Sequence, residues 1–459
     1  MPNTSYNKVI LALAFPAVLQ TIIRSSFSIV DMYWVGKLGS DALAALTVAT
    51  FLVWGILAIT EMISTGTNSL VAQSVGAEDA PLSSRVSTVN LFNTFFYSLI
   101  IGFAIIPVLP FLYDLVNLDL KHSVLSNEYL ITILVGLPCV ALLSTASAVF
   151  RGYGDTKSPF YLLIIAVILN VVTTPLFIFG TVDWLGFGFS GFGLRGAALG
   201  TLLSYLTAFM FGYVWLRRKD YIAPLTTYKF NPLIIKETFR IGLPISLNGV
   251  AFSMIYVFVA RFVTEYGDTG LAAMGIGHRS ESLAYQTCVG FSLAATILVG
   301  QNMGAGKPEQ AEKYAWRIVG VGSVIVGIYA VILFFFSSGI ASIFTNDPSV
   351  IEAASRYNKF AAAVLLFSVA DVVLSGAFSG AGDTVPPALI GLPFNILRIP
   401  LCAVLSPIFG LDGIWIAISV SVFMKGVIIS IWFRRGKWKS RRPKLTTPRE
   451  NITELTGIE

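Results

Sequence analysis

The chain has 459 residues, of which 55% are hydrophobic and only 12% are charged, against about 25% charged residues in ordinary soluble domains. This composition is typical of a membrane protein and leaves no room for a sizeable soluble domain. The net charge of +6 does not indicate a nucleic-acid partner, because no soluble basic face accompanies it.

Apolar segments long enough to cross a bilayer as helices, which takes about 20 residues each, follow one another along the whole chain. Twelve are predicted, at 9–35, 42–75, 86–114, 128–150, 159–181, 195–216, 238–264, 271–303, 314–344, 354–379, 386–409 and 413–433. Several exceed the required length, which predicts tilt, kinks or ends that protrude into water. Backbone groups find no water in the hydrocarbon region, so we expect an all-α fold.

The basic residues indicate an orientation. With both termini in the cytoplasm, 21 of the 31 Lys and Arg residues fall on the cytoplasmic side, five lie outside and five lie within spans. This asymmetry is the positive-inside bias. We therefore expect a multi-pass protein of the cell's inner (plasma) membrane, with both termini cytoplasmic and basic loops near anionic lipid headgroups. The first segment lacks a cleavage site and is expected to be retained.

An internal duplication is the strongest organisational signal. The string "FRGYGDTKSP" at 150–159 matches "FSGAGDTVPP" at 378–387, and "VAQSVGA" at 71–77 matches "VGQNMGA" at 299–305, both at an offset of 228. The chain thus reads as two six-helix halves in the same membrane orientation, the parallel-repeat arrangement of some transporters, with the substrate path between the halves. Such a duplication suits an alternating-access carrier better than a receptor or an enzyme.

The duplication sets the expected domain borders. We predict an N-terminal six-helix lobe at 1–216, a basic cytoplasmic linker at 217–237, a C-terminal six-helix lobe at 238–435 and a basic cytoplasmic tail at 436–459.

Each half contains a G-x-G-D-T turn. The glycines can take positive φ, and the Asp and Thr side chains can cap the next helix. These residues are Gly152, Gly154, Asp155 and Thr156 in the first half and Gly380, Gly382, Asp383 and Thr384 in the second. The Lys and Ser/Thr spacing of a phosphate-binding P-loop is absent, which favours a structural role for the turns.

Several of these motifs together resemble the multidrug and toxic compound extrusion (MATE) family, with its prokaryotic NorM-like and DinF-like branches. They are "VDMYWVG" in the first helix, "LVAQSVGA" and "LVGQNMGAG" at the ends of the second and eighth, and the paired turns. The resemblance runs from Leu11 to about Arg435. It implies a V-shaped protein with twelve transmembrane helices in two lobes, which exchanges inward H⁺ or Na⁺ for an outward-moving amphipathic, often cationic, organic compound.

Asp31 is the leading candidate for the coupling residue. A charge at the bilayer centre costs at least about 2.5–3.5 kcal/mol, so such residues are functional candidates by default. The duplicate of Asp31 is Val259, so the fold itself does not require an acid at this position. The alternative is a structural role, in which Asp31 forms an ion pair with Arg24, two turns earlier on roughly the same helix face.

The resemblance implies that Asp31 forms a cation-coupling site with Asn170 and Thr201, and we include Thr174 in the predicted site. Many relatives place a second aspartate where this chain has Thr174, so the resemblance does not extend to two carboxylates that share a proton. Oxygen ligands at Asp31 and Asn170 suit Na⁺, while a lone buried carboxyl group suits H⁺. The sequence does not choose between these ions.

Other polar groups in the spans are candidates for contact with the substrate. Glu61 could attract cationic substrates or belong to an internal hydrogen-bond network. Asp371 lies one turn after the position that the resemblance gives to a tenth-helix acid, and its role stays open. The run "GHRSESLAYQ" contains a further acid, Glu281. The full candidate set is Arg24, Tyr33, Glu61, His278, Arg279, Glu281, Tyr285, Gln286 and Asp371.

The predicted function is that of an antiporter that exports amphipathic organic compounds, expected to be cationic, in exchange for H⁺ or Na⁺. A flippase for a lipid-linked precursor is the alternative, because Arg24, Arg261, Arg279 and Arg398 provide cationic groups in the spans. The chain has two histidines and no metal-ligand or nucleophile motif, so we expect neither an enzyme nor a cofactor. Expected partners are the small-molecule substrate and membrane lipid, around a monomer.

Overall fold

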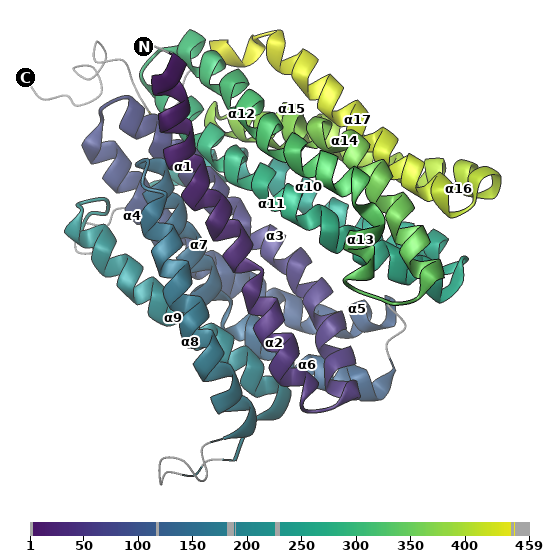
Figure 1. Cartoon of the computed structure of the whole chain (residues 1–459). Helices are drawn as coiled ribbons and strands as arrows, with labels where there is room; N and C mark the ends of the chain where they lie inside the picture. Colours follow the sequence, from purple (N-terminus) through teal and green to yellow (C-terminus); the bar gives the residue numbers. More distant parts are fainter. Residues whose placement is uncertain are drawn as a thin grey trace, which may run out of the picture. The chain divides into compact units, whose positions relative to one another are not determined.

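A computed structural model describes residues 3–115, 119–180, 188, 190–224, 230–441 and 445 of the chain. Within these residues the protein is built from helices, with one isolated bridge between Gly180 and Ser190 and no strand (Figure 1). The predicted all-α fold is therefore confirmed. Most of the expected basic tail at 436–459, and residues 225–229 of the expected linker, lie outside the described residues.

The first half of the chain contributes nine α-helices and one short 3₁₀ helix among the described residues. They are α1 (Asn3–Arg24), α2 (Ser26–Gly36), α3 (Ser40–Gly76), α4 (Ala80–Ile105), η1 (Ile106–Val108), α5 (Leu109–Leu115), α6 (Leu120–Val135), α7 (Leu137–Gly152), α8 (Lys157–Phe179) and α9 (Gly193–Arg218).

The second half follows the same order of spans. Its helices are α10 (Pro232–Thr264), α11 (Gly267–Gly304), α12 (Pro308–Phe335), α13 (Ser337–Ser342), α14 (Pro348–Gly380), α15 (Val385–Ile396), α16 (Arg398–Phe409), α17 (Leu411–Arg434) and η3 (Lys437–Ser440). Eleven described segments are long and apolar enough to cross a membrane, or twelve if the bent pair α6 and α7 counts as one span. The twelve predicted segments match these elements.

The first predicted span is broken between α1 and α2. The Ser25 N–H donates to the Ile22 carbonyl oxygen over 3.1 Å, a contact to the third preceding residue in place of the fourth. The break falls between Arg24 and Asp31, so these two residues lie on different helical segments.

Prolines mark two further breaks. Pro138 has no N–H to donate to Leu134, and α6 and α7 meet there at a bend of 49°. Pro400 likewise cannot donate to Ile396, and α15 gives way to α16 at that place. These proline breaks explain why two predicted spans consist of two helices each.

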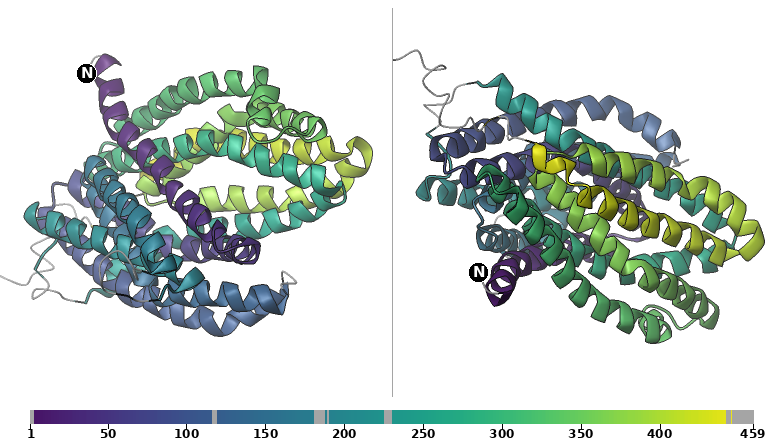
Figure 2. Two further views of the ribbon diagram at one scale, coloured as in Figure 1. Left: turned by 60° about the horizontal axis from the view of Figure 1, so that its bottom comes forward. Right: turned by 90° about the horizontal axis from the view of Figure 1, so that it is seen from above.

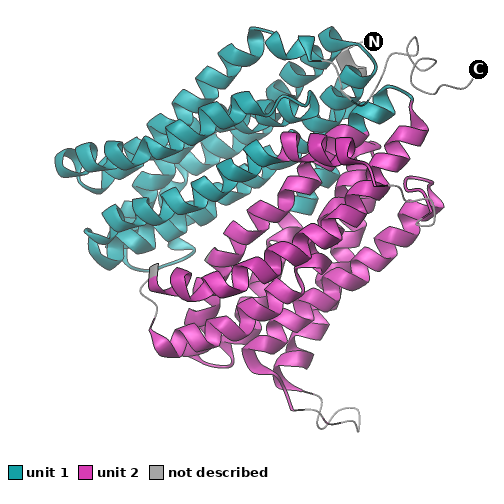
Figure 3. Ribbon diagram, turned by 180° about the vertical axis from the view of Figure 1, so that it is seen from behind, with its two compact units in different colours: residues 1–21, 72–78, 243–459 teal, residues 22–71, 79–242 magenta. Residues whose placement is uncertain are grey.

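The described chain divides into two compact units (Figure 3). Unit 1 comprises Met1–Thr21, Ala72–Glu78 and Leu243–Glu459, and unit 2 comprises Ile22–Val71 and Asp79–Gly242. In unit 1 the helices α11, α12, α14 and α17 pack side by side, and in unit 2 α8 and α9 pack together with α7 (Figures 1 and 2). Part of the first half of the chain thus belongs to unit 1.

Within unit 1 the duplicated motifs "VAQSVGA" and "VGQNMGA" pack against each other. A Cβ atom added at Gly76 would lie 1.9 Å from the Gln301 carbonyl oxygen, and one added at Gly304 would lie 1.9 Å from the Gln73 carbonyl oxygen. Because these distances exclude any side chain, both glycines allow two helix ends to meet through their backbones. The repeated motif therefore has a packing role.

The two G-x-G-D-T turns share their backbone path. Gly154 and Gly382 have φ values of +83° and +74°, as expected. Gly152 and Gly380, by contrast, are the last residues of α7 and α14 and remain helical, so the expectation of positive φ is wrong for them.

The capping interactions of the two turns differ. Asp155 Oδ1 accepts a hydrogen bond from the Ser158 N–H over 2.9 Å and caps α8 as predicted. Asp383 cannot repeat this contact, because the residue three positions later is Pro386, which has no N–H. Its carboxylate instead lies 3.1 Å from Arg441. The predicted threonine caps are also wrong, since neither Thr156 nor Thr384 makes a side-chain cap.

Candidate functional site

Asp31 lies on α2 in unit 2, with only 6% of its surface exposed. The Thr201 hydroxyl group on α9 is 3.4 Å from Asp31 Oδ1 and 3.3 Å from Oδ2, so it can donate to either oxygen. Asn170 and Thr174 on α8 also interact with this carboxyl group. The four residues predicted to form a cation site are thus brought together from α2, α8 and α9.

Asn170 is fully buried and orders the neighbouring hydroxyl groups. Its Nδ2 donates to Thr174 Oγ1 over 2.9 Å and to Thr201 Oγ1 over 3.0 Å. Its Oδ1 has no hydrogen-bond partner in the described part of the chain. A buried acceptor without a partner is costly, so this oxygen is available to a donor or a cation that reaches the cluster.

Local sequence explains much of this geometry. Asn170 and Thr174 are four residues apart and therefore lie on one face of α8. Gly200 lets α9 approach that face, since a Cβ atom there would lie 2.7 Å from the Thr174 Cα atom. Thr201 follows Gly200 directly and is thereby placed beside Asn170.

The cluster offers hard oxygen ligands around a single carboxylate. Asp31 supplies the negative charge, and Thr174, Thr201 and Asn170 supply neutral oxygens. This set fits Na⁺, which prefers such ligands, and it equally fits H⁺, which needs one buried carboxyl group with a neighbouring acceptor.

Arg24 and Glu61 form an ion pair, with 3.1 Å between Nη2 and Oε1. Glu61 also accepts a hydrogen bond from the Ser144 hydroxyl group over 2.8 Å. The alternative that Arg24 pairs with Asp31 is therefore not what the structure shows. Glu61 belongs to the internal network that was one of its two expected roles.

The remaining candidates in the first half of the chain do not join the Asp31 cluster. Tyr33 is 58% exposed, and the Lys37 amino group lies 4.7 Å from the centre of its ring. Its position on α2 directs it away from the buried carboxylate two residues earlier.

The run "GHRSESLAYQ" lies on α11 in unit 1 and contains residues in different environments. Glu281 accepts a hydrogen bond from the Tyr357 hydroxyl group over 2.7 Å. The His278 ring lies edge-on to Tyr256 at 4.8 Å, and its Nε2 has no hydrogen-bond partner among the described residues. Arg279 is exposed.

The last two residues of this run differ in their surroundings. Gln286 Nε2 donates to the Thr21 carbonyl oxygen, and Thr21 Oγ1 donates to the Gln286 carbonyl oxygen, each over 2.9 Å. Gln286 therefore holds α1 to α11 within unit 1. Tyr285 is 49% exposed.

Asp371 on α14 pairs with Lys425 on α17, with 3.1 Å between the carboxylate and the amino group. Both side chains are largely buried. Lys425 is absent from the candidate set although it lies within a predicted span, where an ionisable residue is itself a signal. Tyr357 and Ser144 are also absent, and an uncharged residue in a span gives no such signal.

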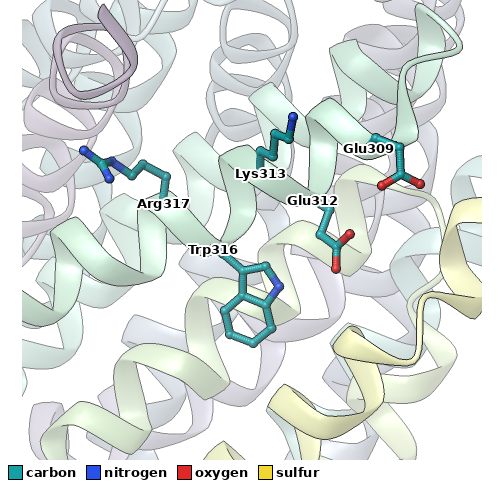
Figure 4. Close-up of a pocket in the computed structure, with 5 residues that line it drawn as sticks. All are labelled: Glu309, Glu312, Lys313, Trp316 and Arg317. Carbon is teal, nitrogen blue, oxygen red and sulfur yellow. The ribbon is translucent and has the colours of Figure 1, made fainter. Parts of the chain in front are cut away.

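A surface pocket on α12 of unit 1 is lined by Glu309, Glu312, Lys313, Trp316 and Arg317 (Figure 4). Lys439 pairs with both glutamates, at 3.0 Å from Glu309 and 2.5 Å from Glu312. These contacts anchor η3 to α12. It contains none of the residues predicted to bind an ion or a substrate.

Comparison with known proteins relates the whole chain to membrane transporters. The family model described as MatE matches residues 16–176 and 244–404, one match in each half. The "Probable multidrug resistance protein NorM" of Thermotoga maritima is 28% identical over 98% of this chain and 96% of its own length. The "FAD transporter" of Shewanella oneidensis is 24% identical over 92% of each chain.

Solved structures support the same fold. An outward-facing MATE family transporter of the MOP superfamily has a TM-score of 0.86 at 22% identity, over 95% of this chain and 97% of the other. A MOP superfamily transporter from Pyrococcus furiosus has a TM-score of 0.85 at 22% identity, over 94% and 95%. These proteins have the two-lobe fold that the duplication predicts. With its family model matched in both halves, this multi-pass membrane protein belongs to the MATE family of transporters.

Proposed function

We propose that this protein is a secondary active antiporter that exports amphipathic organic compounds in exchange for H⁺ or Na⁺ by alternating access. The observation that carries the proposal is the buried Asp31 carboxylate, surrounded by the oxygens of Asn170, Thr174 and Thr201. Relatives named as multidrug resistance and multidrug export proteins support export of small molecules, and they point to a transporter rather than an enzyme.

The charge of Asp31 provides a means of coupling. A buried carboxylate without a cationic partner is costly in a span, and binding of H⁺ or Na⁺ removes that cost. A cation that binds one conformation better than the other shifts the equilibrium between them by its difference in binding free energy. Cation entry at Asp31 can therefore drive the change in access that releases the exported compound.

Asn170 gives the site a way to respond to either ion. Its free Oδ1 can accept a hydrogen bond from a protonated carboxyl group, or it can serve as a neutral ligand to Na⁺. In both cases the hydrogen bonds from Nδ2 to Thr174 and Thr201 stay in place, so the amide orientation is fixed before the cation arrives.

The ion pairs in the structure bear on the charge expected of the exported compound. The sequence suggested a cationic substrate, attracted by Glu61 or by acids of the second half. In the structure Glu61 is paired with Arg24, and Asp371 is paired with Lys425. We therefore define the substrate only as an amphipathic organic compound. This class includes FAD, the compound for which one relative is named.

We place the protein in the inner membrane with both termini in the cytoplasm, on the basis of the positive-inside bias. The test of coupling uses purified protein in proteoliposomes, with a pH gradient and a Na⁺ gradient imposed separately. Wild-type protein is expected to move a fluorescent amphipathic compound under at least one of them. Asp31→Asn should abolish gradient-driven transport while the protein stays folded in the membrane.

The matched control is Asp268→Asn, which removes an exposed acid at the start of α11 and should leave transport unchanged. Full gradient-driven transport by Asp31→Asn would contradict the role given to Asp31. Transport by wild type that ignores both gradients would contradict antiport with H⁺ or Na⁺.

A further inference from the structure

Arg398 is a buried cation in unit 1, and only 1% of its surface is exposed. It is the first residue of α16, directly after the break from α15. Its Nε donates to Ser421 Oγ on α17 over 2.6 Å, and Ser421 in turn donates to the Ile418 carbonyl oxygen over 2.8 Å. The chain of hydrogen bonds fixes the plane of the guanidinium group.

Two aromatic rings lie close to the Arg398 guanidinium group. The guanidinium carbon lies 5.5 Å from the ring centre of Phe252 and 5.3 Å from that of Tyr256, both on α10. These ring faces attract the cation, but they provide no negative charge. Nη1 of Arg398 has no hydrogen-bond partner among the described residues.

The carboxylates of the same region are already engaged. Asp371 pairs with Lys425 at 3.1 Å, and Glu281 accepts the Tyr357 hydroxyl hydrogen bond at 2.7 Å. No carboxylate in the described part of the chain lies within 4.0 Å of the Arg398 guanidinium nitrogens. Burial of a cation without a carboxylate is costly, and so is a buried donor without an acceptor.

A second polar atom without a partner lies near Tyr256. The His278 ring meets Tyr256 edge-on at 4.8 Å, and its Nε2 makes no hydrogen bond to the described residues. Tyr256 thus lies next to both the guanidinium group and the imidazole ring. Both groups can donate to an oxyanion, the guanidinium as a permanently charged donor and the imidazole through Nε2 when that atom carries the ring proton.

We propose that Arg398, with Tyr256, Phe252 and His278, forms a recognition site for the carboxylate or phosphate group of an amphipathic aromatic compound carried by this protein. The inference rests on the proposed export function and defines one class of its substrates. The guanidinium group binds the oxyanion, and the neighbouring rings contact the apolar part of the compound.

Exposure of the surrounding rings fits this division of roles. Phe252 is 37% exposed, and Tyr256 and His278 are partly exposed, whereas Arg398 is buried. An aromatic compound can therefore stack on the outer rings while its charged group replaces the missing partner of Nη1. A cationic compound would be repelled by the guanidinium group.

Equilibrium binding gives the first test. Riboflavin 5′-phosphate and riboflavin share one ring system and differ by a phosphate group, so their binding to purified wild-type protein isolates the contribution of the anion. We expect riboflavin 5′-phosphate to bind at least tenfold more tightly. Arg398→Gln should remove that difference, and Arg398→Lys should retain part of it, because a lysine keeps the charge but not the fixed donor geometry.

The matched control is Arg261→Gln. Arg261 is also an arginine in a span beside an aromatic ring, Phe258 at 5.8 Å, but its side chain is exposed. This variant should bind both flavins as the wild type does. Equal binding of the two flavins by the wild type would overturn the proposal, and so would an equal loss of both in Arg398→Gln.

Transport separates this inference from the proposed function. Proteoliposomes made only of zwitterionic lipid are loaded with riboflavin 5′-phosphate or with the cationic dye rhodamine 123. We expect Arg398→Gln to raise the KM for riboflavin 5′-phosphate at least tenfold and to leave rhodamine 123 transport within twofold of wild type.

These experiments distinguish a failure of the anion site from a failure of the proposed export function. Gradient-driven rhodamine 123 transport without binding of riboflavin 5′-phosphate would overturn the anion site and leave the exporter in place. Anion binding without gradient-driven transport of any compound would overturn the exporter and retain the site. Flipping of a fluorescent anionic lipid that is lost in Arg398→Gln, without flavin transport, would assign the site to lipid headgroups and overturn the proposal.

Discussion

Arg24 Nη2 lies 3.1 Å from Glu61 Oε1, and this ion pair joins the last residue of α1 to the middle of α3. This pairing also affects a third residue, Asp31. Asp31 has no cationic partner within 4.0 Å among the described residues and is held by hydroxyl and amide groups alone. The pairing of Glu61 with Arg24 thereby leaves the Asp31 carboxylate free to bind a transported cation.

The Arg24–Glu61 pair should contribute modestly to stability. Both side chains are partly exposed, at 44% and 32%, so we expect Glu61→Gln to lower the free energy of unfolding by about 1 kcal/mol. Thermal unfolding of Glu61→Gln, Arg24→Gln and the double variant measures the coupling between the residues. Strictly additive losses would show that the pair makes no net contribution.

Thr201 should affect coupling through its hydrogen bond to Asp31. Thr201→Ala removes a donor to a charged group, worth about 1.5–3 kcal/mol, and should weaken the dependence of transport on the driving ion roughly tenfold or more. Thr201→Ser should restore it. The measurement is the initial transport rate as a function of pH and of Na⁺ concentration.

The control for this prediction lies on the same helix. The Thr207 hydroxyl group is bonded to the Leu203 carbonyl oxygen, so Thr207→Ala should not change the ion dependence. An ion dependence of Thr201→Ala equal to that of the wild type would show that Thr201 does not take part.

Lys425 should be essential for stability because it neutralises Asp371. Lys425→Met leaves a buried carboxylate without its partner, which should lower the free energy of unfolding by about 3–5 kcal/mol. The double variant Asp371→Asn with Lys425→Met removes both charges and should recover most of that loss. Thermal unfolding in detergent reports both effects.

The same variants decide whether Asp371 participates in transport. If the pair is purely structural, the double variant transports at a rate close to that of the wild type. A stable double variant without gradient-driven transport would instead show that Asp371 takes part in the cycle.

The Asp155–Lys219 pair predicts a dependence of stability on pH. Burial tends to raise the pKa of Asp155, but hydrogen bonds from Lys219 at 2.5 Å and from Ser158 outweigh it and hold the pKa below its usual value. The lowered pKa means that the stabilisation is fully present above the unfolded-state pKa of about 3.9 and is lost as the pH falls through the folded-state pKa.

Asp155→Asn should therefore unfold at a lower temperature than the wild type at pH 7, with a difference that shrinks below about pH 4. The loss should stay within about 1 kcal/mol, because the Lys219 side chain is 44% exposed. In a Lys219→Met background the substitution should have a smaller effect. A difference that grows as the pH falls would contradict this account.

The class of the protein and its duplicated organisation could be predicted from the order of its amino acids. The length of each apolar segment and the offset of 228 between repeats are properties of the chain that need no contacts to be read. Local spacing also placed Asn170 and Thr174 on one face of α8, because residues four apart in a helix are neighbours.

Which charged residues form ion pairs depends on how the helices pack against one another. Helical period shows which residues share a face, but not which other helix that face contacts. Arg24 therefore appeared to belong with Asp31, yet α3 brings Glu61 to it, and α17 brings Lys425 to Asp371. The same is true of the buried Arg398. The packing of α10, α11, α14 and α17 around it leaves its guanidinium group without a carboxylate partner.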